Sequence, residues 1–492
     1  MKKMSRRSFV KKTAVAAGAV CGAGLLTDAA SYARVIGAND KVRLALAGAG
    51  GRGGEHCKFF SEIPNVEFVW VVEPDANRAG AMAKRVADTF KTTPKVGSEY
   101  RAMLEDKDVD AVSVASCNHW HALMGIWACQ ADKDVFLEKP CSQNLAEGRV
   151  LIDTAEKTKR IVQHGTQNRS LLGWKAVAEA IRNEKYGKLI GAKVYCHRPR
   201  PGLKFKPTGD PPANLDWNQW IGPVAMEPYH ANLMPYNWHW FWNTGNGEIG
   251  NNGVHYFDIC RWVLGWMHPN SAISFGTRFV PDKETDYKDQ AETPNIQFVL
   301  YDFNGIPLVY ESCGLRGKKE EWTPWEKPEF YTDQGVFDRS GKNYLFRPNG
   351  GGEPVVIYNG NDTPEGYTEK FPQRHFENFI NCVRDRDASK LFAPIREGHY
   401  SAGICHWGNV SYRTAEPAPL DKAREAMGDN PLMLKSMDSV LTNVQKVLDI
   451  DPKEIPFMLG KKLEIDVEKE KVTNLEAANA FLTRPPRAPF VA

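Results

Sequence analysis

Short apolar runs and amphipathic segments alternate between residues 41 and 168. The apolar runs have the length of buried strands, and the segments between them show the periodicity of helices. We expect strands at 42–47, 66–72, 111–115, 134–137 and from 161, and helices through 60 and at 77–90, 121–131 and 145–159. Repeated strand–helix units of this length predict an α/β fold with a parallel, doubly wound sheet over residues 40–168.

The pattern changes near residue 170. We expect a helix at 173–183 and a longer strand at 188–197, followed by a Pro-, Gly- and aromatic-rich loop layer at 199–246. Further strands are expected at 272–280, 295–301 and 306–312, and helices at 371–386 and 399–414. This spacing predicts an α+β domain over 169–415 with a large, open, mostly antiparallel sheet. Residues 416–492 form a C-terminal extension with helical pieces and no motif that we can interpret.

The first 33 residues have the features of an export signal. The segment from Ser5 to Lys11 resembles the twin-arginine motif, and the apolar run 14–26 is too short to span a membrane. Small residues at Ser31 and Ala33 offer a cleavage site. We expect a periplasmic protein that is exported folded and has no membrane insertion after signal removal. The alternative is a disordered or helical N-terminal tail.

Charge and cysteine spacing narrow the function classes. Without residues 1–33 the chain has 57 basic and 59 acidic side chains, so no basic field remains to bind nucleic acid. The nine cysteines beyond the leader form no CxxC pair and none lies at zinc spacing with histidine. We therefore expect no metal site, and the sequence does not pair the cysteines.

A glycine turn follows the first expected strand. Gly48, Gly50 and Gly53 form GxGxxG, which permits a tight turn, close approach of a pyrophosphate and close helix–strand packing. The next helix presents its free N–H groups to the phosphates. These features predict a Rossmann dinucleotide-binding domain, with Gly51 and Arg52 also at the cofactor.

An acidic residue ends the second expected strand. A carboxylate at Glu73 can accept both adenosine ribose hydroxyls and repels a 2′-phosphate, which favours NAD over NADP. Asp75 is a rival for this role, and Arg52 or Arg78 would allow NADP instead. The expected cofactor is NAD.

Four further motifs occur in a specific order: Asn118-His119-Trp120-His121, Glu138-Lys139-Pro140, the segment 247–258 and Arg396-Glu397-Gly398-His399. Together they resemble the glucose–fructose oxidoreductase/inositol dehydrogenase (Gfo/Idh/MocA) family from about Lys41 to Thr414. The resemblance implies that Asn118, His121 and Glu138 lie at the cofactor.

The same resemblance implies the acid–base residues. Lys139 would lie at the nicotinamide and relay a proton, and His255 matches the family's catalytic histidine. The family usually has Asp four residues before this histidine, whereas this chain has Asn251, which orients a hydroxyl but accepts no proton. Asp258 either orients His255 or serves packing. Taken alone, Lys139 is equally a solvated lysine and His255 a core residue.

The aromatic loop 217–242 suits a carbohydrate. Aromatic rings stack on the apolar faces of sugars, and polar neighbours bind their hydroxyls. We expect Trp238, His239 and Trp240 to contact substrate, although many of these rings must be core or an oligomer interface.

Three functions remain open from the sequence. The first is oxidation or reduction of a sugar or glycoside hydroxyl by tightly bound NAD. The second is NAD-dependent glycoside hydrolysis through transient oxidation and elimination. The third is a non-catalytic sugar-binding protein that keeps NAD. The resemblance also implies a homo-oligomer formed through the C-terminal domain sheet.

Overall fold

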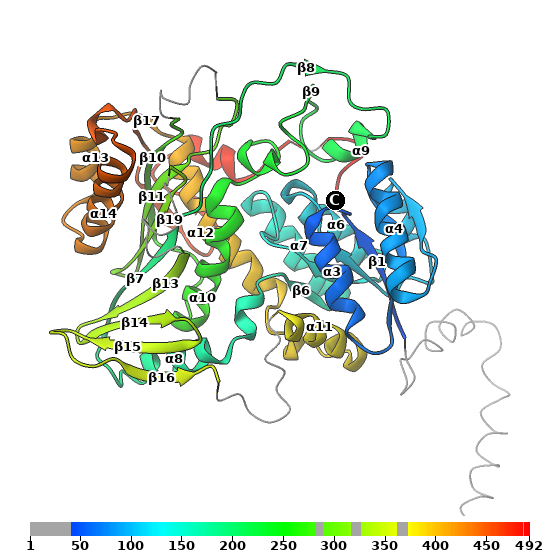
Figure 1. Cartoon of the computed structure of the whole chain (residues 1–492), viewed down its shortest axis with the longest axis horizontal. Helices are drawn as coiled ribbons and strands as arrows, with labels where there is room; N and C mark the ends of the chain where they lie inside the picture. The colour runs from blue at the N-terminus through cyan, green and yellow to red at the C-terminus, as the bar shows by residue number, and fades with distance from the viewer. Residues whose placement is uncertain (1–40, 281–288, 316–325, 362–371, 486) are drawn as a thin grey trace, which may run out of the picture. The chain divides into compact units, whose positions relative to one another are not determined.

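The computed structural model describes residues 41–280, 289–315, 326–361, 372–485 and 487–492. The expected export signal lies outside these residues. From Val42 onward the chain forms one compact unit built around two sheets (Figure 1).

The first sheet is parallel and six-stranded. Its strand order is β3-β2-β1-β4-β5-β6, the doubly wound order expected from the sequence, so this part of the predicted fold is confirmed. The sequence pattern did not reveal β3, because it has only three residues and two of them are exposed. The strands are β1 Val42–Ala47, β2 Val66–Val72, β3 Lys95–Gly97, β4 Ala111–Val114, β5 Asp134–Leu137 and β6 Val162–His164.

Helices cover both faces of this sheet. They are α3 Gly51–Ser61, α4 Ala76–Phe90, α5 Tyr100–Leu104, α6 Asn118–Gln130 and α7 Leu145–Thr158. A later helix, α11 Gln373–Asp385, returns to this sheet, where Phe376 stacks on Phe136 of β5 and meets Phe60 of α3 edge-on. The first domain is therefore completed by a segment that follows it by more than 200 residues.

The second sheet is large and mixed. Its main path is β16-β15-β14-β13-β7-β12-β11-β10-β18-β17, and among these pairs only β7 and β12 run parallel. This agrees with the expected mostly antiparallel sheet, although the sequence pattern did not reveal β13 to β16. The strands are β7 Leu189–Cys196, β10 Ser271–Thr277, β11 Ile296–Phe303, β12 Ile306–Cys313, β13 Glu326–Thr332, β14 Gly335–Ser340, β15 Asn343–Pro348, β16 Val355–Asn359, β17 Glu416–Pro417, β18 Met458–Leu459, β19 Leu463–Asp466 and β20 Lys471–Val472.

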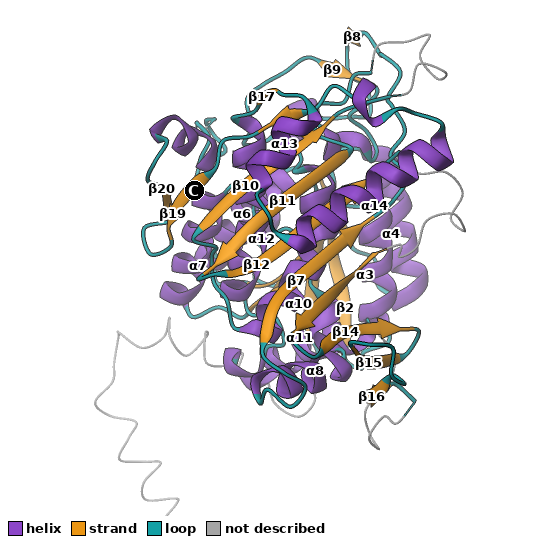
Figure 2. Ribbon diagram, turned by 90° about the vertical axis from the view of Figure 1, so that its left-hand side faces the viewer, coloured by secondary structure: helices purple, strands orange, loops and turns teal. Residues whose placement is uncertain are grey.

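Helices lie on both faces of the second sheet. On the inner face lie α8 Leu172–Arg182, α10 Val254–Leu264 and α12 Ile395–Arg413, whose apolar residues share a core with β7 and β10–β12. On the outer face, α13 Leu420–Met427 and α14 Pro431–Leu448 pack over β10–β12 (Figure 2). Helices α13 and α14 of the C-terminal extension are thus built into the second domain and cover an apolar part of the sheet.

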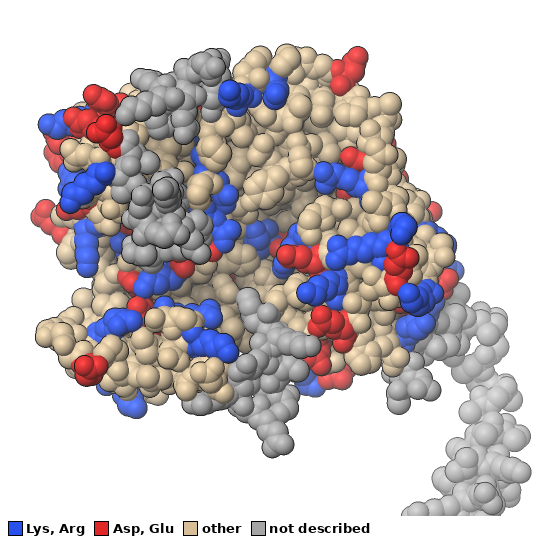
Figure 3. All heavy atoms as spheres, in the orientation of Figure 1, with Lys and Arg blue, Asp and Glu red and all other residues tan. Residues whose placement is uncertain are grey.

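The surface has no dominant charge on the face shown in Figure 3, where basic and acidic side chains are interspersed around a hollow. In the part of the chain that the structure describes, no helix is both long and apolar enough to cross a membrane.

Candidate functional site

A cavity of about 320 Å³ lies at the carboxyl ends of β1, β2, β4 and β5. Gly48 there has φ +98°, and a Cβ on this residue would lie 2.5 Å from the Ala115 carbonyl oxygen. A Cβ on Gly53 would lie 2.1 Å from the Gly48 oxygen. The turn therefore requires glycine at both positions, for backbone conformation at Gly48 and for close helix–strand packing at Gly53.

The helix that follows the turn is open at its N-terminus. Gly50 is the N-cap of α3, no side chain caps this end, and its first turn has no acidic residue. A Cβ on Gly51 would meet no atom within 4 Å. Because unpaired N–H groups with free space before them bind phosphate oxygens, this end fits a dinucleotide pyrophosphate.

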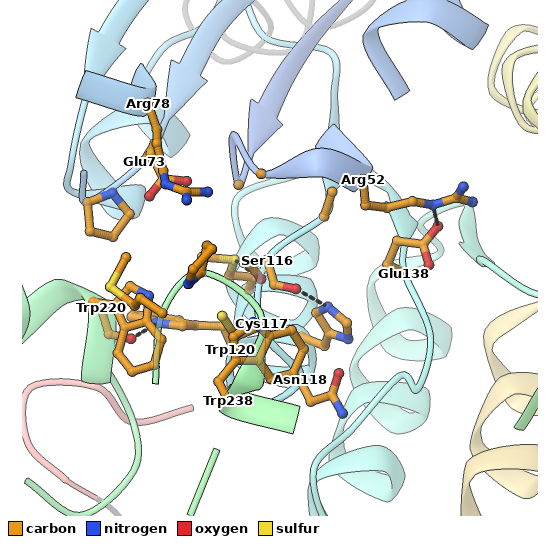
Figure 4. Close-up of a pocket in the computed structure, with 18 of the residues that line it drawn as sticks. Arg52, Glu73, Arg78, Ser116, Cys117, Asn118, Trp120, Glu138, Trp220 and Trp238 are labelled. Atoms are coloured by element: carbon orange, nitrogen blue, oxygen red, sulfur yellow. Dashed lines mark hydrogen bonds and ion pairs between the residues drawn. The ribbon is translucent and has the colours of Figure 1, made fainter. Parts of the chain in front are cut away.

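Glu73 ends β2 beside the turn. Its carboxylate accepts the Ala49 N–H at 2.7 Å and the Asp75 N–H at 3.1 Å, and burial raises its pKa. Asp75 instead caps α4 by accepting from the N–H groups of Asn77 and Arg78, and it does not line the cavity. Arg78 lies next to Glu73 at the same end of the cavity (Figure 4).

Glu138 and Arg52 lie at the other end of the cavity (Figure 4). The buried Glu138 carboxylate accepts from Arg52 Nε at 2.7 Å, from Gln167 Nε2 at 3.3 Å and contacts His56 Nε2 at 3.1 Å. Although burial alone raises the pKa of Glu138, Arg52, His56 and Lys139 hold it well below its usual range. The carboxylate stays charged and fixes the start of the segment that contains Lys139.

Lys139 is half-buried and reaches across to the second domain. Its Nζ donates to the Asn251 carbonyl at 2.7 Å and to Asn251 Oδ1 at 3.1 Å. Burial lowers the pKa of Lys139 to about 8. An ammonium group with this pKa gains and loses a proton near neutral pH.

Asn251 lies in a widened helical turn, Ile249–Gly253, that precedes α10. Turns of this π type often occur at functional sites, and here the Asn251 carbonyl is one acceptor for Lys139. Asn251 Nδ2 donates to the Tyr236 hydroxyl at 3.2 Å. Lys139, Asn251 and Tyr236 thus form one hydrogen-bonded row along the cavity wall.

His239 and Trp238 complete this wall. The His239 ring stacks on Trp238 with centroids 3.6 Å apart, and its Nδ1 contacts the Tyr236 carbonyl at 2.7 Å. Burial holds the pKa of His239 well below its usual range, so the ring is neutral and its Nε2 is an acceptor.

His121 and Asn118 line the cavity from the first turn of α6. Both ring nitrogens of His121 contact backbone carbonyls, those of Pro140 at 2.6 Å and Ser116 at 3.0 Å. His121 therefore ties the Lys139–Pro140 segment to the end of β4. Asn118 Nδ2 donates to Asn246 Oδ1 at 3.0 Å, which joins the two domains.

The structure brings together most of the predicted site residues. Those that line the cavity are Gly48, Gly50, Gly51, Arg52, Glu73, Asn118, His121, Glu138, Lys139, Trp238, His239 and Asn251. Gly53, Trp240, His255 and Asp258 do not line it. Trp240 is buried under the Arg200 guanidinium, 4.8 Å from its ring centre.

His255 and Asp258 differ most from the interpretation made from sequence. His255 Nδ1 is buried without a hydrogen-bond partner, and burial, together with the charge on Lys139, holds its pKa well below the usual range. Asp258 is fully buried, accepts from Arg169 Nε at 2.7 Å and from the Ser401 hydroxyl at 2.7 Å, and makes no hydrogen bond to His255. Its contacts join α10 to the segment after β6 and to α12.

Several cavity residues were not assigned to the site from sequence. Tyr236 is the chief one, and the density of aromatic residues in its loop was the available signal. Further lining residues include Tyr100, Ser116, Cys117, Trp120, Met124, Gln219, Trp220 and Met234.

Outside the cavity, the described residues include one group of side chains of the kinds that bind metals. His268 Nε2 and His399 Nε2 lie 2.9 and 2.8 Å from Glu470 Oε1, and Arg149 pairs with the same carboxylate. The Trp407 N–H points at His268 Nδ1 at 3.2 Å, which makes Nδ1 the acceptor and leaves the proton on Nε2. Metal-bound histidines have the opposite arrangement, so these contacts suit a hydrogen-bonded cluster.

Two arginines that follow β7 form ion pairs. Arg198 pairs with Glu326, and Arg200 Nε pairs with Glu248 at 2.6 Å. The nine cysteines after the leader are all free thiols.

Comparison with known proteins agrees with this geometry. Residues 42–166 match the model of an oxidoreductase family with an NAD-binding Rossmann fold, and residues 200–277 match the C-terminal alpha/beta domain of the same family. A glycosyl hydrolase family 109 protein of Shewanella pealeana is 27% identical over 224 residues, which cover 41% of this chain and 48% of that protein. The chain thus spans about half the length of the relatives it matches.

Solved structures of low sequence identity share the fold. Levoglucosan dehydrogenase, solved with NADH and levoglucosan, has a TM-score of 0.56 at 15% identity, covering 75% of this chain and 98% of that one. The WlbA dehydrogenase of Bordetella pertussis, solved with NADH and UDP-GlcNAcA, has a TM-score of 0.53 at 16% identity, covering 75% and 97%.

The fold and the cavity are those of an NAD-binding α/β protein. Its two domains resemble those of the Gfo/Idh/MocA oxidoreductase family, whose models match residues 42–166 and 200–277. The glycine turn, the open end of α3 and the Glu73 carboxylate fit NAD, as expected from the sequence.

Proposed function

We propose that this protein oxidises or reduces a hydroxyl group of a sugar or glycoside with NAD that stays bound between turnovers. One observation is the main support. The Lys139 ammonium and Asn251 meet in the same cavity as the glycine turn and Glu73, so an acid–base group adjoins a dinucleotide site.

Lys139 acts as the proton-transfer group in this proposal. In the oxidation direction the neutral amine accepts the hydroxyl proton, and in reduction the ammonium returns it to the carbonyl oxygen. When bound, NAD supplies the acceptor or donor of the hydride. The Asn251 oxygens fix the position of Nζ, and Glu138 fixes the segment that precedes it.

The wall formed by Tyr236, Trp238, His239 and Asn251 recognises the sugar. The Tyr236 hydroxyl accepts from Asn251 and keeps its own proton for a ligand oxygen, while the neutral His239 offers an acceptor. Trp238 supplies an apolar ring for the C–H face of a sugar. His255 is a second proton group in this proposal only if the bound substrate reaches its unpartnered Nδ1.

A second candidate function is NAD-dependent glycoside hydrolysis, which the glycosyl hydrolase family 109 relatives favour. Transient oxidation of a ring hydroxyl makes the neighbouring C–H acidic, the leaving group departs with a proton, and water adds to the sugar. Return of the hydride to the sugar completes a cycle without net redox change.

Product analysis separates these functions. The purified protein is first denatured to identify released NAD by mass spectrometry, and the native protein is then given free sugars and matching aryl glycosides without added cofactor. A keto-sugar supports the first function, and free phenol with unoxidised sugar supports the second. Sugar binding with neither product would instead support a non-catalytic NAD-containing protein.

Export and self-association also remain proposals. Residues 1–33 would direct folded, NAD-loaded protein to the periplasm, which explains why the cofactor needs to stay bound. Detection of mature protein that begins near Arg34 tests the export proposal.

A homo-oligomer would form through the part of the second sheet that α13 and α14 leave uncovered, since these helices pack over β10–β12.

A further inference from the structure

A segment from outside the first domain lines the cofactor cavity beside Glu73, and the chain end binds that segment. The segment, residues 214–222, contains α9 Trp217–Ile221 and supplies Gln219 and Trp220 to the cavity lining. We call it the cover segment. The chain end comprises residues 484–485 and 487–492, which we call the C-terminal strap. Figure 1 shows the C-terminus beside α6 and α9.

The cover segment is bonded to the first domain along its whole length. Asn214 accepts from the Ala76 N–H and donates to Asp75, each at 2.8 Å, and the Asp216 N–H donates to Pro74 at 3.0 Å. Gln219 donates to Glu99 at 2.8 Å. These bonds hold the segment beside Glu73, where the adenosine end of the dinucleotide would lie.

The last residues of the cover segment pack on α6. The Trp120 indole N–H donates to the Trp220 carbonyl at 3.0 Å. Gly222 follows with φ +53°, and a Cβ there would lie 2.1 Å from the Trp120 ring. The cover segment and α6 therefore form two adjoining walls of the same cavity end.

The strap binds both of these walls. Arg487 donates to the Gly222 carbonyl at 2.5 Å, to Asn218 Oδ1 at 2.9 Å and to the Asn218 carbonyl at 3.1 Å. On the α6 side, Arg484 donates to the His119 carbonyl at 2.9 Å. One short stretch of chain thus connects the cover segment to the helix on which it closes.

An apolar anchor ends the strap. Phe490 is 2% exposed and lies in the core of the first domain, edge-on to Trp120 with ring centres 5.5 Å apart. The Trp127 indole N–H donates to the Val491 carbonyl at 2.8 Å. Lifting the strap would expose the Phe490 ring to water, and the loss of its burial energy opposes opening.

We propose that the C-terminal strap is a latch that keeps NAD bound, with Arg487 and Phe490 as positioning residues for the cover segment. Release of a dinucleotide needs the cover segment to move away from α6, and that movement breaks the Arg487 bonds. The latch rests on one part of the proposed function, namely that NAD stays bound between turnovers.

The test measures NAD dissociation, which needs no sugar turnover. Protein loaded with NAD is diluted into a large excess of a fluorescent NAD analogue, and the exchange rate is followed for wild type, Arg487→Gln and Phe490→Ala. Val491→Ser is the matched control, because the Val491 side chain is 45% exposed and only its backbone oxygen bonds to Trp127.

We expect exchange at least tenfold faster in Arg487→Gln and Phe490→Ala, with Val491→Ser unchanged. Arg487→Gln removes polar contacts at the surface, so its melting temperature serves to separate latch loss from misfolding. Wild-type exchange rates in a folded Arg487→Gln variant would overturn the latch while leaving the sugar oxidoreductase proposal intact. If NAD exchange is slow in wild type and fast in Arg487→Gln, but the protein turns over no sugar, the latch is supported and the sugar oxidoreductase proposal is contradicted.

Discussion

The Lys139 ammonium donates to both oxygens of Asn251, at 2.7 Å to the carbonyl and 3.1 Å to the side chain. The two residues come from different domains and are 112 positions apart in the chain. This contact joins the cofactor-binding part of the site to the part that would meet the substrate.

Replacing Asn251 by aspartate will move the pH dependence of sugar oxidation. The pKa of Lys139 is about 8, and the neutral amine is the base, so the rate rises as pH increases through this value. A carboxylate beside Lys139 favours the charged ammonium form of this lysine and so raises its pKa. In Asn251→Asp the rising limb therefore shifts to higher pH, by about one pH unit or more.

The pH profile of kcat/KM measures this shift. Asn77→Asp, which adds the same charge on the exposed first turn of α4, is the control and keeps the wild-type profile. An unchanged limb in Asn251→Asp would mean that another group titrates.

Removing the Tyr236 hydroxyl will raise the KM for the sugar more than it lowers kcat. In Tyr236→Phe the Asn251 amide loses its acceptor and the sugar loses a hydroxyl partner, so KM rises about five- to tenfold, equivalent to about one hydrogen bond. Steady-state kinetics test this, with Tyr229→Phe from the same loop as the control. A large loss of kcat with unchanged KM would assign Tyr236 to proton transfer instead.

A methyl group at Gly53 will damage the dinucleotide turn. Its Cβ would lie 2.1 Å from the Gly48 oxygen, so Gly53→Ala shifts α3 away from β1 and weakens NAD binding at least tenfold. Gly80→Ala in α4 meets no atom within 4 Å and gains helix stability of about 1 kcal/mol. Equilibrium titration with NAD distinguishes the two, and equal affinities would contradict the role given to the turn.

Asp258 will matter for stability. Asp258→Asn leaves the buried Arg169 with Glu397 as its remaining charge partner, so the cost lies below the value of about 3–5 kcal/mol for a buried charge left unpaired. The melting temperature should fall by several degrees, whereas Asp108→Asn, which loses an exposed pair with Arg43, should change it little. A catalytic defect in Asp258→Asn at unchanged stability would restore its role in orienting a catalytic histidine.

Much of the first domain was predictable because its signals are local. The strand, glycine turn and helix around Gly48 follow one another in the chain, and each glycine has a steric reason. The doubly wound order then follows from repeated strand–helix units. The short strand β3 is an exception, since three residues, two of them exposed, produce no periodic signal.

The rest of the site depends on contacts between distant segments. Nothing near Asp258 in the sequence indicates its partner Arg169, and nothing near Phe490 indicates that it packs on Trp120. The sequence does not distinguish Tyr236 from the other aromatic residues of its loop, whereas in the structure its hydroxyl accepts from Asn251 Nδ2. Long-range partners of this kind follow from the fold, so a one-dimensional pattern does not reveal them.

The most direct test of the account is a single-turnover absorbance measurement on NAD-loaded protein mixed with a sugar that it binds. The account predicts growth of the reduced-nicotinamide band in wild type, and a rate at least about a hundredfold lower in Lys139→Met with its NAD content unchanged. An equal rate in Lys139→Met, or sugar binding to wild type without any change in the band, would contradict the claim that Lys139 transfers the proton during oxidation of a sugar hydroxyl.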